Sequence, residues 1–187
     1  MKSGRANFFE MAECHAVMGI DLAALPKNPT GICMMYENKI SLDTVYGDEE
    51  IMEIIRKVKM EVIAIDAPLM EEVKVRDVDK LLKKYGAMPP TMKGMRKLTE
   101  RAWELLKKIE KECDARIIEV FPTATAKILG IYSRKWKEMR DILGIEARNK
   151  HELDAYLCAL TACLYREGRA IEVGKDGKVV VPLEYGD

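Results

Sequence analysis

Short apolar runs separated by turn residues form the first interpretable part of the chain. Residues 16–24 are mostly apolar and include Asp21, a cluster rich in Pro, Asn and Gly follows, and residues 32–36 and 39–46 continue the pattern. Runs of this length between turn residues predict three strands joined as a meander. Asp48 is predicted to cap the amphipathic helix that follows, whose apolar positions recur with helical spacing.

The middle of the chain holds two further predicted strands and the helices between them. Residues 61–69 form a continuous apolar run that is too short for a helix and is bounded by Pro68, as in a central parallel strand buried on both faces. Residues 116–121 form another strand, which Pro122 ends. Helices are predicted over 76–84 and 89–113, and the apolar residues of the longer one form a stripe along one side.

The last part of the chain is predicted to be mainly helical and to end in a hairpin. A helix over 123–129 is followed by a basic connection over 133–148 and by a strong helix over 152–166. An Asp-Gly step predicts the turn of a final hairpin between 171–173 and 178–181. We find no internal repeat or linker, and therefore expect one domain over 16–187, preceded by a poorly specified leader over 1–15.

The composition indicates a globular protein whose charges are balanced overall but not locally. Apolar residues make up 48% and charged residues 33% of the chain, and 31 Lys and Arg balance 31 Asp and Glu. This balance argues against a polybasic protein that binds phosphate through its total charge. Residues 74–111 nevertheless carry 12 basic and 5 acidic side chains. The absence of Gln, with abundant Glu, Lys and Arg, is a bias described for heat-adapted proteins.

The cysteine and histidine content narrows the compartment and the choice of metal. The 5 cysteines include no Cys-x-x-Cys pair, and the sequence shows neither a signal-peptide pattern nor an apolar run long enough to cross a bilayer. We therefore expect a cytoplasmic protein with reduced thiols and no membrane partner. With only 2 His, a metal site would rely on carboxylates, which favours Mg²⁺ or Mn²⁺.

Four acidic residues stand where their neighbours are apolar, and they form the candidate site. Asp21 ends the first strand, and Asp66 ends the first parallel strand. Glu119 lies within the second parallel strand, and Asp154 lies in the first turn of the last long helix. An unpaired buried carboxylate is costly, so each requires a cation, a donor or a metal. If the first and fourth strands are adjacent and parallel, Asp21 and Asp66 meet at one end of the sheet, where a divalent ion would offset their repulsion.

Each of these residues also has a purely structural interpretation. Asp21 and Asp66 can form turns at the strand ends, and Asp154 can interact favourably with the dipole of its helix. Glu119 can pair with a buried arginine. His151, three residues before Asp154, is either an auxiliary base or partner of a ligand, or an exposed histidine at a helix start. The coincidence of four acids at compatible positions favours a common site.

Five short motifs resemble a known family. In chain order they are GIDLA with its turn and TG, VIAIDAPL, MKGMRKLTERA, IIEVFPTATAKILG and HELDAYLCALTA. Together they resemble domain-of-unknown-function family 429, described as predicted nucleases of the ribonuclease H fold, akin to RuvC and YqgF. The resemblance spans about residues 17–169. It implies an α/β ribonuclease H-like fold, with a mixed five-stranded sheet in the order 3-2-1-4-5 flanked by helices and a small C-terminal hairpin.

The resemblance also implies a site and an activity. Asp21, Asp66 and Asp154 correspond to metal ligands, and Glu119 lies in the family's Glu-hydrophobic-aromatic-Pro strand. The step from His151 to Asp154 is similar to the helix start of RuvC-type resolvases. The implied activity is Mg²⁺- or Mn²⁺-dependent hydrolysis of phosphodiester bonds in nucleic acid. By analogy with junction-cutting relatives, we expect a homodimer.

The local excess of basic residues gives candidates for contact with the nucleic-acid backbone. The candidates come from the two central helices: Arg76, Lys93, Arg96, Lys97 and Arg101. Basic residues at such spacing are also common on a solvated helix face, and that interpretation stays open.

Two other functions stay open at this stage. One is a nucleotide-dependent phosphotransferase on the related actin-like fold, whose first strand also carries an Asp before a phosphate-binding hairpin. Here Leu-Ala-Ala-Leu-Pro follows Asp21 in place of the usual Gly and Ser or Thr, and the sequence has no Walker-type loop. The other is a binding module of the same fold without catalysis, for which binding would not depend on a metal.

Overall fold

The computed structural model describes residues 16–36 and 39–183, which form a main sheet, a hairpin and the helices around them. The main sheet has the order β3-β2-β1-β4-β5, with β1 to β3 antiparallel and β4 and β5 parallel to β1. Its strands are β1 (Val17–Asp21), β2 (Thr30–Tyr36), β3 (Lys39–Val45), β4 (Val62–Ile65) and β5 (Arg116–Glu119). The predicted meander and sheet order are confirmed, whereas the predicted leader, residues 1–15, lies outside the described residues.

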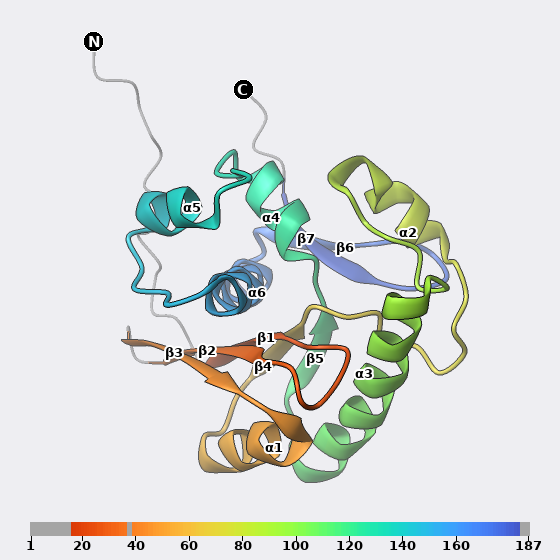
Figure 1. The fold of residues 1–187 in the computed structure, drawn as a ribbon, viewed down its shortest axis with the longest axis horizontal. Helices are drawn as coiled ribbons and strands as arrows, with labels where there is room; N and C mark the ends of the chain where they lie inside the picture. The colour runs from red at the N-terminus through yellow and green to blue at the C-terminus, as the bar shows by residue number, and fades with distance from the viewer. Residues whose placement is uncertain (1–15, 37–38, 184–187) are drawn as a thin grey trace.

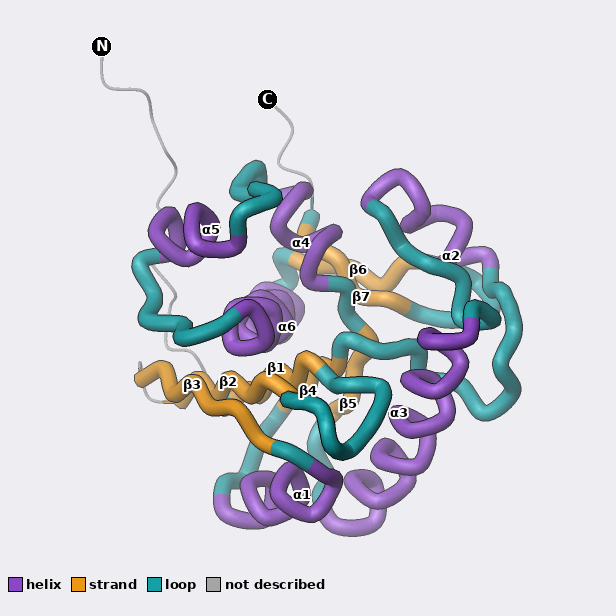
Figure 2. The backbone as a smooth tube through the Cα atoms, viewed as in Figure 1, coloured by secondary structure: helices purple, strands orange, loops and turns teal. Residues whose placement is uncertain are grey.

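Helices cover both faces of this sheet (Figure 1). One face carries α1 (Gly47–Lys57) and α3 (Lys93–Glu112). The other carries α6 (Lys150–Arg166), over which lie α4 (Pro122–Ile128) and α5 (Trp136–Leu143). A short helix α2 (Asp77–Leu81), continued by the turn η1 (Leu82–Tyr85), lies near a separate hairpin of β6 (Ala170–Val173) and β7 (Val179–Pro182). The predicted C-terminal hairpin is confirmed, and the long loops on either side of α2 are seen in Figure 2.

The sheet separates two hydrophobic cores because its side chains alternate between faces. Val17 belongs to the core beneath α6, whereas its neighbour Met18 belongs to the core formed with α1 and α3. Helix α6 is buried from Glu152 to Leu164. The main sheet covers one side of the helix, and α4 and α5 also pack against it. A helix buried this completely holds its amino-terminal residues firmly against the ends of the strands.

The structure differs from the sequence-based expectation at two helices. Asp48 does not cap α1: the helix begins at Gly47, and the Asp48 carboxylate instead accepts a hydrogen bond of 2.9 Å from Arg101 on α3. The segment predicted as a basic connection contains the helix α5. Met139 and Leu143 lie on its buried side, but the many charged residues around them made this apolar stripe hard to recognise in the sequence.

Cysteines and possible membrane spans also bear on the sequence-based expectations. In the described part of the chain, Cys33, Cys113 and Cys158 are free thiols, as predicted for these three residues. Of the helices in residues 16–36 and 39–183, none combines the length and apolar character that crossing a bilayer requires.

Gly19 allows α6 to lie directly on β1. A Cβ atom at this position would overlap the backbone oxygen of Ala155 and the backbone nitrogen of Ala159. We therefore expect Gly19→Ala to destabilise the protein by about 1–3 kcal/mol, the usual cost of overpacking a tight core. Urea unfolding measures this difference. Gly94→Ala is the matched control, because nothing lies within 4 Å of its Cβ position and alanine favours the helix; equal stabilities of the two variants would contradict the close approach.

Candidate functional site

Asp21 and Asp66 lie side by side where β1 and β4 end. The two strands pair in parallel with Ile20 opposite Ile65, and the backbone nitrogen of Asp66 donates a hydrogen bond of 2.9 Å to the oxygen of Ile20. Asp21 is the last residue of β1, and Asp66 follows β4 directly. The predicted meeting of these two acids at one end of the sheet is therefore confirmed.

The beginning of α6 brings three more polar side chains to this end of the sheet. The Nδ1 atom of His151 lies 2.7 Å from Oδ2 of Asp21. The ammonium group of Lys150 donates a hydrogen bond of 2.7 Å to Oδ2 of Asp154. Because α6 begins at Lys150 and not at Glu152, Asp154 lies two residues further into the helix than the sequence indicated. His151 thus contacts a candidate ligand, and is not a histidine that stands alone at a helix start.

The three acids repel one another, and Asp66 is the least compensated. Burial raises the pKa of Asp66 well above its usual value, and Asp21 and Asp154 raise it further. Burial and then Asp21 also raise the pKa of Asp154, against the hydrogen bond from Lys150. The hydrogen bond to Asp21 raises the pKa of His151. Within the described residues, the carboxylate of Asp66 has no hydrogen-bond or ion-pair partner.

The chemistry of this donor set fits a divalent cation. Carboxylate oxygens are the ligands that Mg²⁺ and Mn²⁺ prefer, and an uncompensated carboxylate gains most from a cation. Residues 16–36 and 39–183 contain no group of three acidic, His or Cys side chains already arranged around a metal position. Lys150 and His151 instead pair with two of the acids. The Lys150 side chain is 62% exposed, so it can turn into solvent and release Asp154.

Glu119 does not join the other acids. Its carboxylate accepts hydrogen bonds of 2.6 Å and 2.7 Å from the guanidinium group of Arg76, and one of 2.9 Å from the backbone of Leu69. Burial raises the pKa of Glu119, and the hydrogen bonds from Arg76 oppose that shift. Arg76 also donates to Asp79 at 2.8 Å. Glu119 thus pairs with a buried arginine, in agreement with its structural interpretation, and we do not assign it to the metal site.

The five basic candidates fall into two groups. Arg76 and Arg101 are buried, and Arg101 donates to Asp48 and to the backbone oxygen of Ala23. A buried, paired guanidinium group is not available to phosphate, so we do not assign these two arginines to nucleic-acid binding. The other three lie exposed at the start of α3, without an ion-pair partner among the described residues: Lys93, Arg96 and Lys97.

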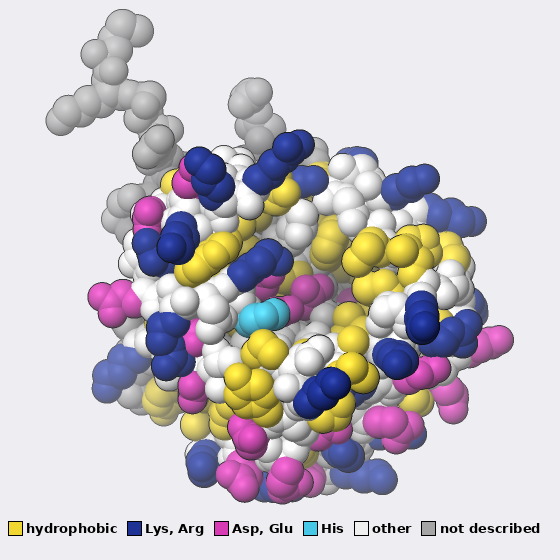
Figure 3. All heavy atoms as spheres, in the orientation of Figure 1, with side chains coloured by type: hydrophobic (Ala, Val, Ile, Leu, Met, Phe, Trp, Pro, Cys, Tyr) yellow, Lys and Arg dark blue, Asp and Glu magenta, His cyan; other side chains and the backbone are white. Residues whose placement is uncertain are grey.

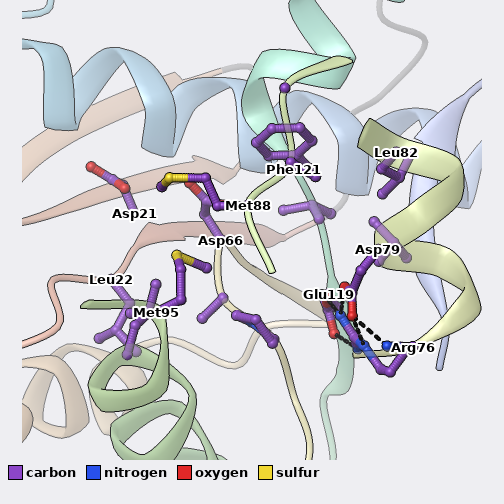
Figure 4. A pocket seen from close by; sticks show the side chains of 17 residues that line it. Asp21, Leu22, Asp66, Arg76, Asp79, Leu82, Met88, Met95, Glu119 and Phe121 are labelled. Carbon is purple, nitrogen blue, oxygen red and sulfur yellow. Dashed lines mark hydrogen bonds and ion pairs between the residues drawn. The ribbon is translucent and has the colours of Figure 1, made fainter. Parts of the chain in front are cut away.

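A pocket of about 250 Å³ opens directly beside Asp21 and Asp66. Its walls come from the ends of β1, β4 and β5, from α2, η1 and α3, from the loop between η1 and α3, and from β7. Figure 3 shows acidic side chains at the bottom of a hollow in this face, with hydrophobic side chains on one rim. Figure 4 shows Met88, Met95 and Leu22 close to the two acids, and the paired Arg76 on the opposite side.

Sequence reasoning missed two residues that shape the site. Lys150 lies four residues before Asp154, and this spacing within a predicted helix was the available signal. Gly31 lies in β2, and a Cβ atom there would overlap the backbone oxygen of His151. A glycine inside a strand is a recognised signal of close backbone approach. It lets the start of α6 lie against β2, which positions His151 beside Asp21.

Comparison with known proteins identifies the fold. No protein-family model and no curated protein matches this chain, so membership of family 429 stays a prediction. Among solved structures, the chain is similar to T. thermophilus RuvC in complex with a Holliday junction substrate, at 17% identity and a TM-score of 0.54. The match covers 82% of this chain and 97% of that chain. With its sheet order and its helices on both faces, the protein has a ribonuclease H-like α/β fold.

Proposed function

We propose that this protein is a divalent-metal-dependent nuclease that hydrolyses phosphodiester bonds in nucleic acid. The observation that carries the proposal is the convergence of Asp21, Asp66 and Asp154 at the carboxyl ends of the parallel strands, with Asp66 uncompensated. Ligand sites of open α/β sheets commonly lie at these ends. The likeness to RuvC, solved with a Holliday junction, supports nucleic acid as the class of substrate.

The side chains of this site have distinct roles in the proposal. Asp21, Asp66 and Asp154 would hold Mg²⁺ or Mn²⁺, which supplies Lewis-acid activation of the phosphodiester and offsets the charge that develops on its oxygens. His151 fixes the orientation of Asp21 through the hydrogen bond at Nδ1. Lys150 neutralises Asp154 before the cation is bound.

The exposed basic residues at the start of α3 would hold the nucleic-acid backbone. Met95 on α3 lines the pocket beside the carboxylates, and the basic residues next to it in the first turns of the helix are Lys93, Arg96 and Lys97. A strand bound at the carboxylates would therefore have cationic side chains along its path. Such phosphate contacts carry little sequence information and weaken as the salt concentration rises.

Cleavage assays on labelled nucleic acids test the proposal. We expect the wild-type protein to cleave at least one of single-stranded DNA or RNA, duplex, hybrid or junction with Mg²⁺ or Mn²⁺, and none with EDTA. Asp21→Asn should lower the rate at least about 100-fold, because even indirect partners of a metal ligand commonly contribute 10- to 100-fold. The matched control is Asp114→Asn, an exposed acid before β5.

Two results would contradict the proposal. One is unchanged metal-dependent cleavage by the Asp21→Asn protein. The other is nucleic-acid binding without cleavage under any metal condition, which would favour a non-catalytic binding module of the same fold.

A further inference from the structure

Most of the lining of the pocket beside Asp21 and Asp66 differs in chemistry from these two carboxylates. Apart from those two acids, the near wall is formed by Leu22, Met88 and Met95. On the opposite side, the carboxylates of Glu119 and Asp79 are already hydrogen-bonded to Arg76. The pocket therefore offers apolar contact rather than free hydrogen-bonding groups.

Phe121 gives this pocket an aromatic surface that is held in place. The backbone of the preceding residue is anchored, because the nitrogen of Val120 donates to the oxygen of Ile65 at 3.0 Å. Phe121 itself has extended backbone geometry, and Pro122 after it is the first residue of α4. A residue before proline is restricted to this region, and proline at the first helical position fixes its own φ. The half-buried ring of Phe121 lines the pocket and packs against the cluster that contains Val78, Leu82 and Val179, so its position does not depend on a ligand.

The charges around the pocket limit what it can receive. Where no cation lies between them, Asp21 and Asp66 would repel a phosphate or another anion that entered the pocket next to them, and the guanidinium group of Arg76 is neutralised by its partners. An uncharged, flat group with apolar faces meets neither obstacle. Met88 is 55% exposed at the pocket, and the flexible thioethers of methionine adapt well to aromatic faces.

We infer that this pocket receives one unstacked nucleobase of the strand whose phosphate lies at the carboxylates, with Phe121 as the stacking surface. The inference rests on the proposed nuclease function and adds a substrate preference to it. A base inside a duplex is stacked and paired, and extracting it has an energetic cost that a single-stranded or locally opened strand avoids. The protein is therefore expected to prefer strands with an unpaired base over intact duplex.

Binding of oligonucleotides with and without bases tests the inference without cleavage. The protein used is the Asp21→Asn/Asp66→Asn double variant, because removing two negative charges lets phosphate approach in the absence of a metal. The probes are an oligothymidylate of about 12 nucleotides, its fully abasic analogue with the same phosphates, and the matching duplex, each made with deoxyribose and ribose backbones. Fluorescence anisotropy measures each dissociation constant.

We expect the oligothymidylate to bind about tenfold more tightly than the abasic strand and the duplex, the size of effect usual for one base on an aromatic ring. Adding Phe121→Leu should weaken binding of the oligothymidylate about tenfold and leave the abasic strand unchanged. Leucine keeps the position apolar, and thermal unfolding verifies that the variant is folded. The control is Ile142→Ala, an exposed apolar residue on α5 that does not line the pocket.

The outcomes separate the inference from the proposed function. Equal binding of the oligothymidylate and the abasic strand, or an equal effect of Phe121→Leu on both, would overturn the base pocket and leave the nuclease proposal standing. Failure of the oligothymidylate to bind would likewise overturn the base pocket, whereas the nuclease proposal is decided by the cleavage assays on the wild-type protein. A base-dependent affinity that Phe121→Leu removes would support the inference.

Discussion

The Arg76→Met protein is expected to be less stable than the wild type by about 3–5 kcal/mol, the usual cost of removing one partner of a buried ion pair. Arg76 is 2% and Glu119 8% exposed, and two short hydrogen bonds join them. Without the guanidinium group, the backbone nitrogen of Leu69 is the one partner that the buried carboxylate keeps among residues 16–36 and 39–183. Urea unfolding at neutral pH measures the loss.

The stability that Arg76→Met loses should depend on pH, because Glu119 stays buried in the variant. In the variant, the hydrogen bonds that lower the pKa of Glu119 are gone, whereas burial, which raises it, remains. The folded-state pKa then lies above that of the unfolded chain, so stability is gained as the pH falls through this raised pKa and lost as the pH rises. The deficit relative to the wild type should therefore be larger near pH 8 than near about pH 5.

The double variant Arg76→Met/Glu119→Leu is the matched control. Replacing both buried charged residues by apolar ones is often neutral, so most of the lost stability should return and the pH dependence caused by Glu119 should disappear. Asp79, the other partner of the guanidinium group, keeps its hydrogen bond from the backbone nitrogen of residue 76. A double variant no more stable than Arg76→Met would show that packing of the arginine dominates. The position of Gly177 shows that Arg76 also has a packing role. A Cβ atom at Gly177 would lie 2.5 Å from Cδ of Arg76, so the hairpin turn packs directly against that side chain.

The strands of the main sheet could be predicted from the sequence because their signals are local, whereas the order of the strands followed from the family resemblance. Each strand of the main sheet is an apolar or alternating run between turn residues, and Pro68 and Pro122 mark the ends of two of them. The meeting of Asp21 and Asp66 followed from the same reasoning, since carboxyl ends of adjacent parallel strands share one edge. In α5 the charged residues outnumber the buried apolar ones, and the apolar spacing was therefore too weak a signal to predict the helix.

The pairings inside the site could not be predicted in the same way. Arg76 and Glu119 lie 43 residues apart, and no periodicity connects a basic residue on a short helix with an acid on β5. Its charge made Arg76 a candidate for binding phosphate, and its charge made Glu119 a candidate metal ligand. In the structure the two side chains neutralise each other. The pocket depends likewise on residues from six separate segments, so its existence is a property of the tertiary structure.

In the absence of divalent ions, Asp66→Asn is expected to stabilise the protein by roughly 1 kcal/mol, within the range of typical stabilising substitutions. The amide has nearly the shape of the carboxyl group but lacks its charge. It therefore removes an anion whose pKa is raised by burial and by Asp21 and Asp154, and which has no partner in the described structure. Thermal or urea unfolding in EDTA at neutral pH measures this gain.

With Mn²⁺ present, the order of stabilities should reverse. A cation at about 100 times its dissociation constant adds about 2.7 kcal/mol to a protein that binds it only when folded. Asp66→Asn should weaken this binding at least about 100-fold and so gain little. Calorimetric titration with Mn²⁺ measures the affinity directly, and Asp114→Asn, an exposed acid, should behave as the wild type in both conditions.

The reversal distinguishes a metal ligand from an acid with a structural role. If Asp66 only stabilised the turn after β4, its substitution would lower stability in EDTA and Mn²⁺ alike, and Mn²⁺ would affect both proteins equally. A gain in EDTA together with a loss of the Mn²⁺ effect requires that the same carboxylate be unfavourable alone and favourable with a cation. That combination is expected of a site whose repulsion is offset by the ion it binds.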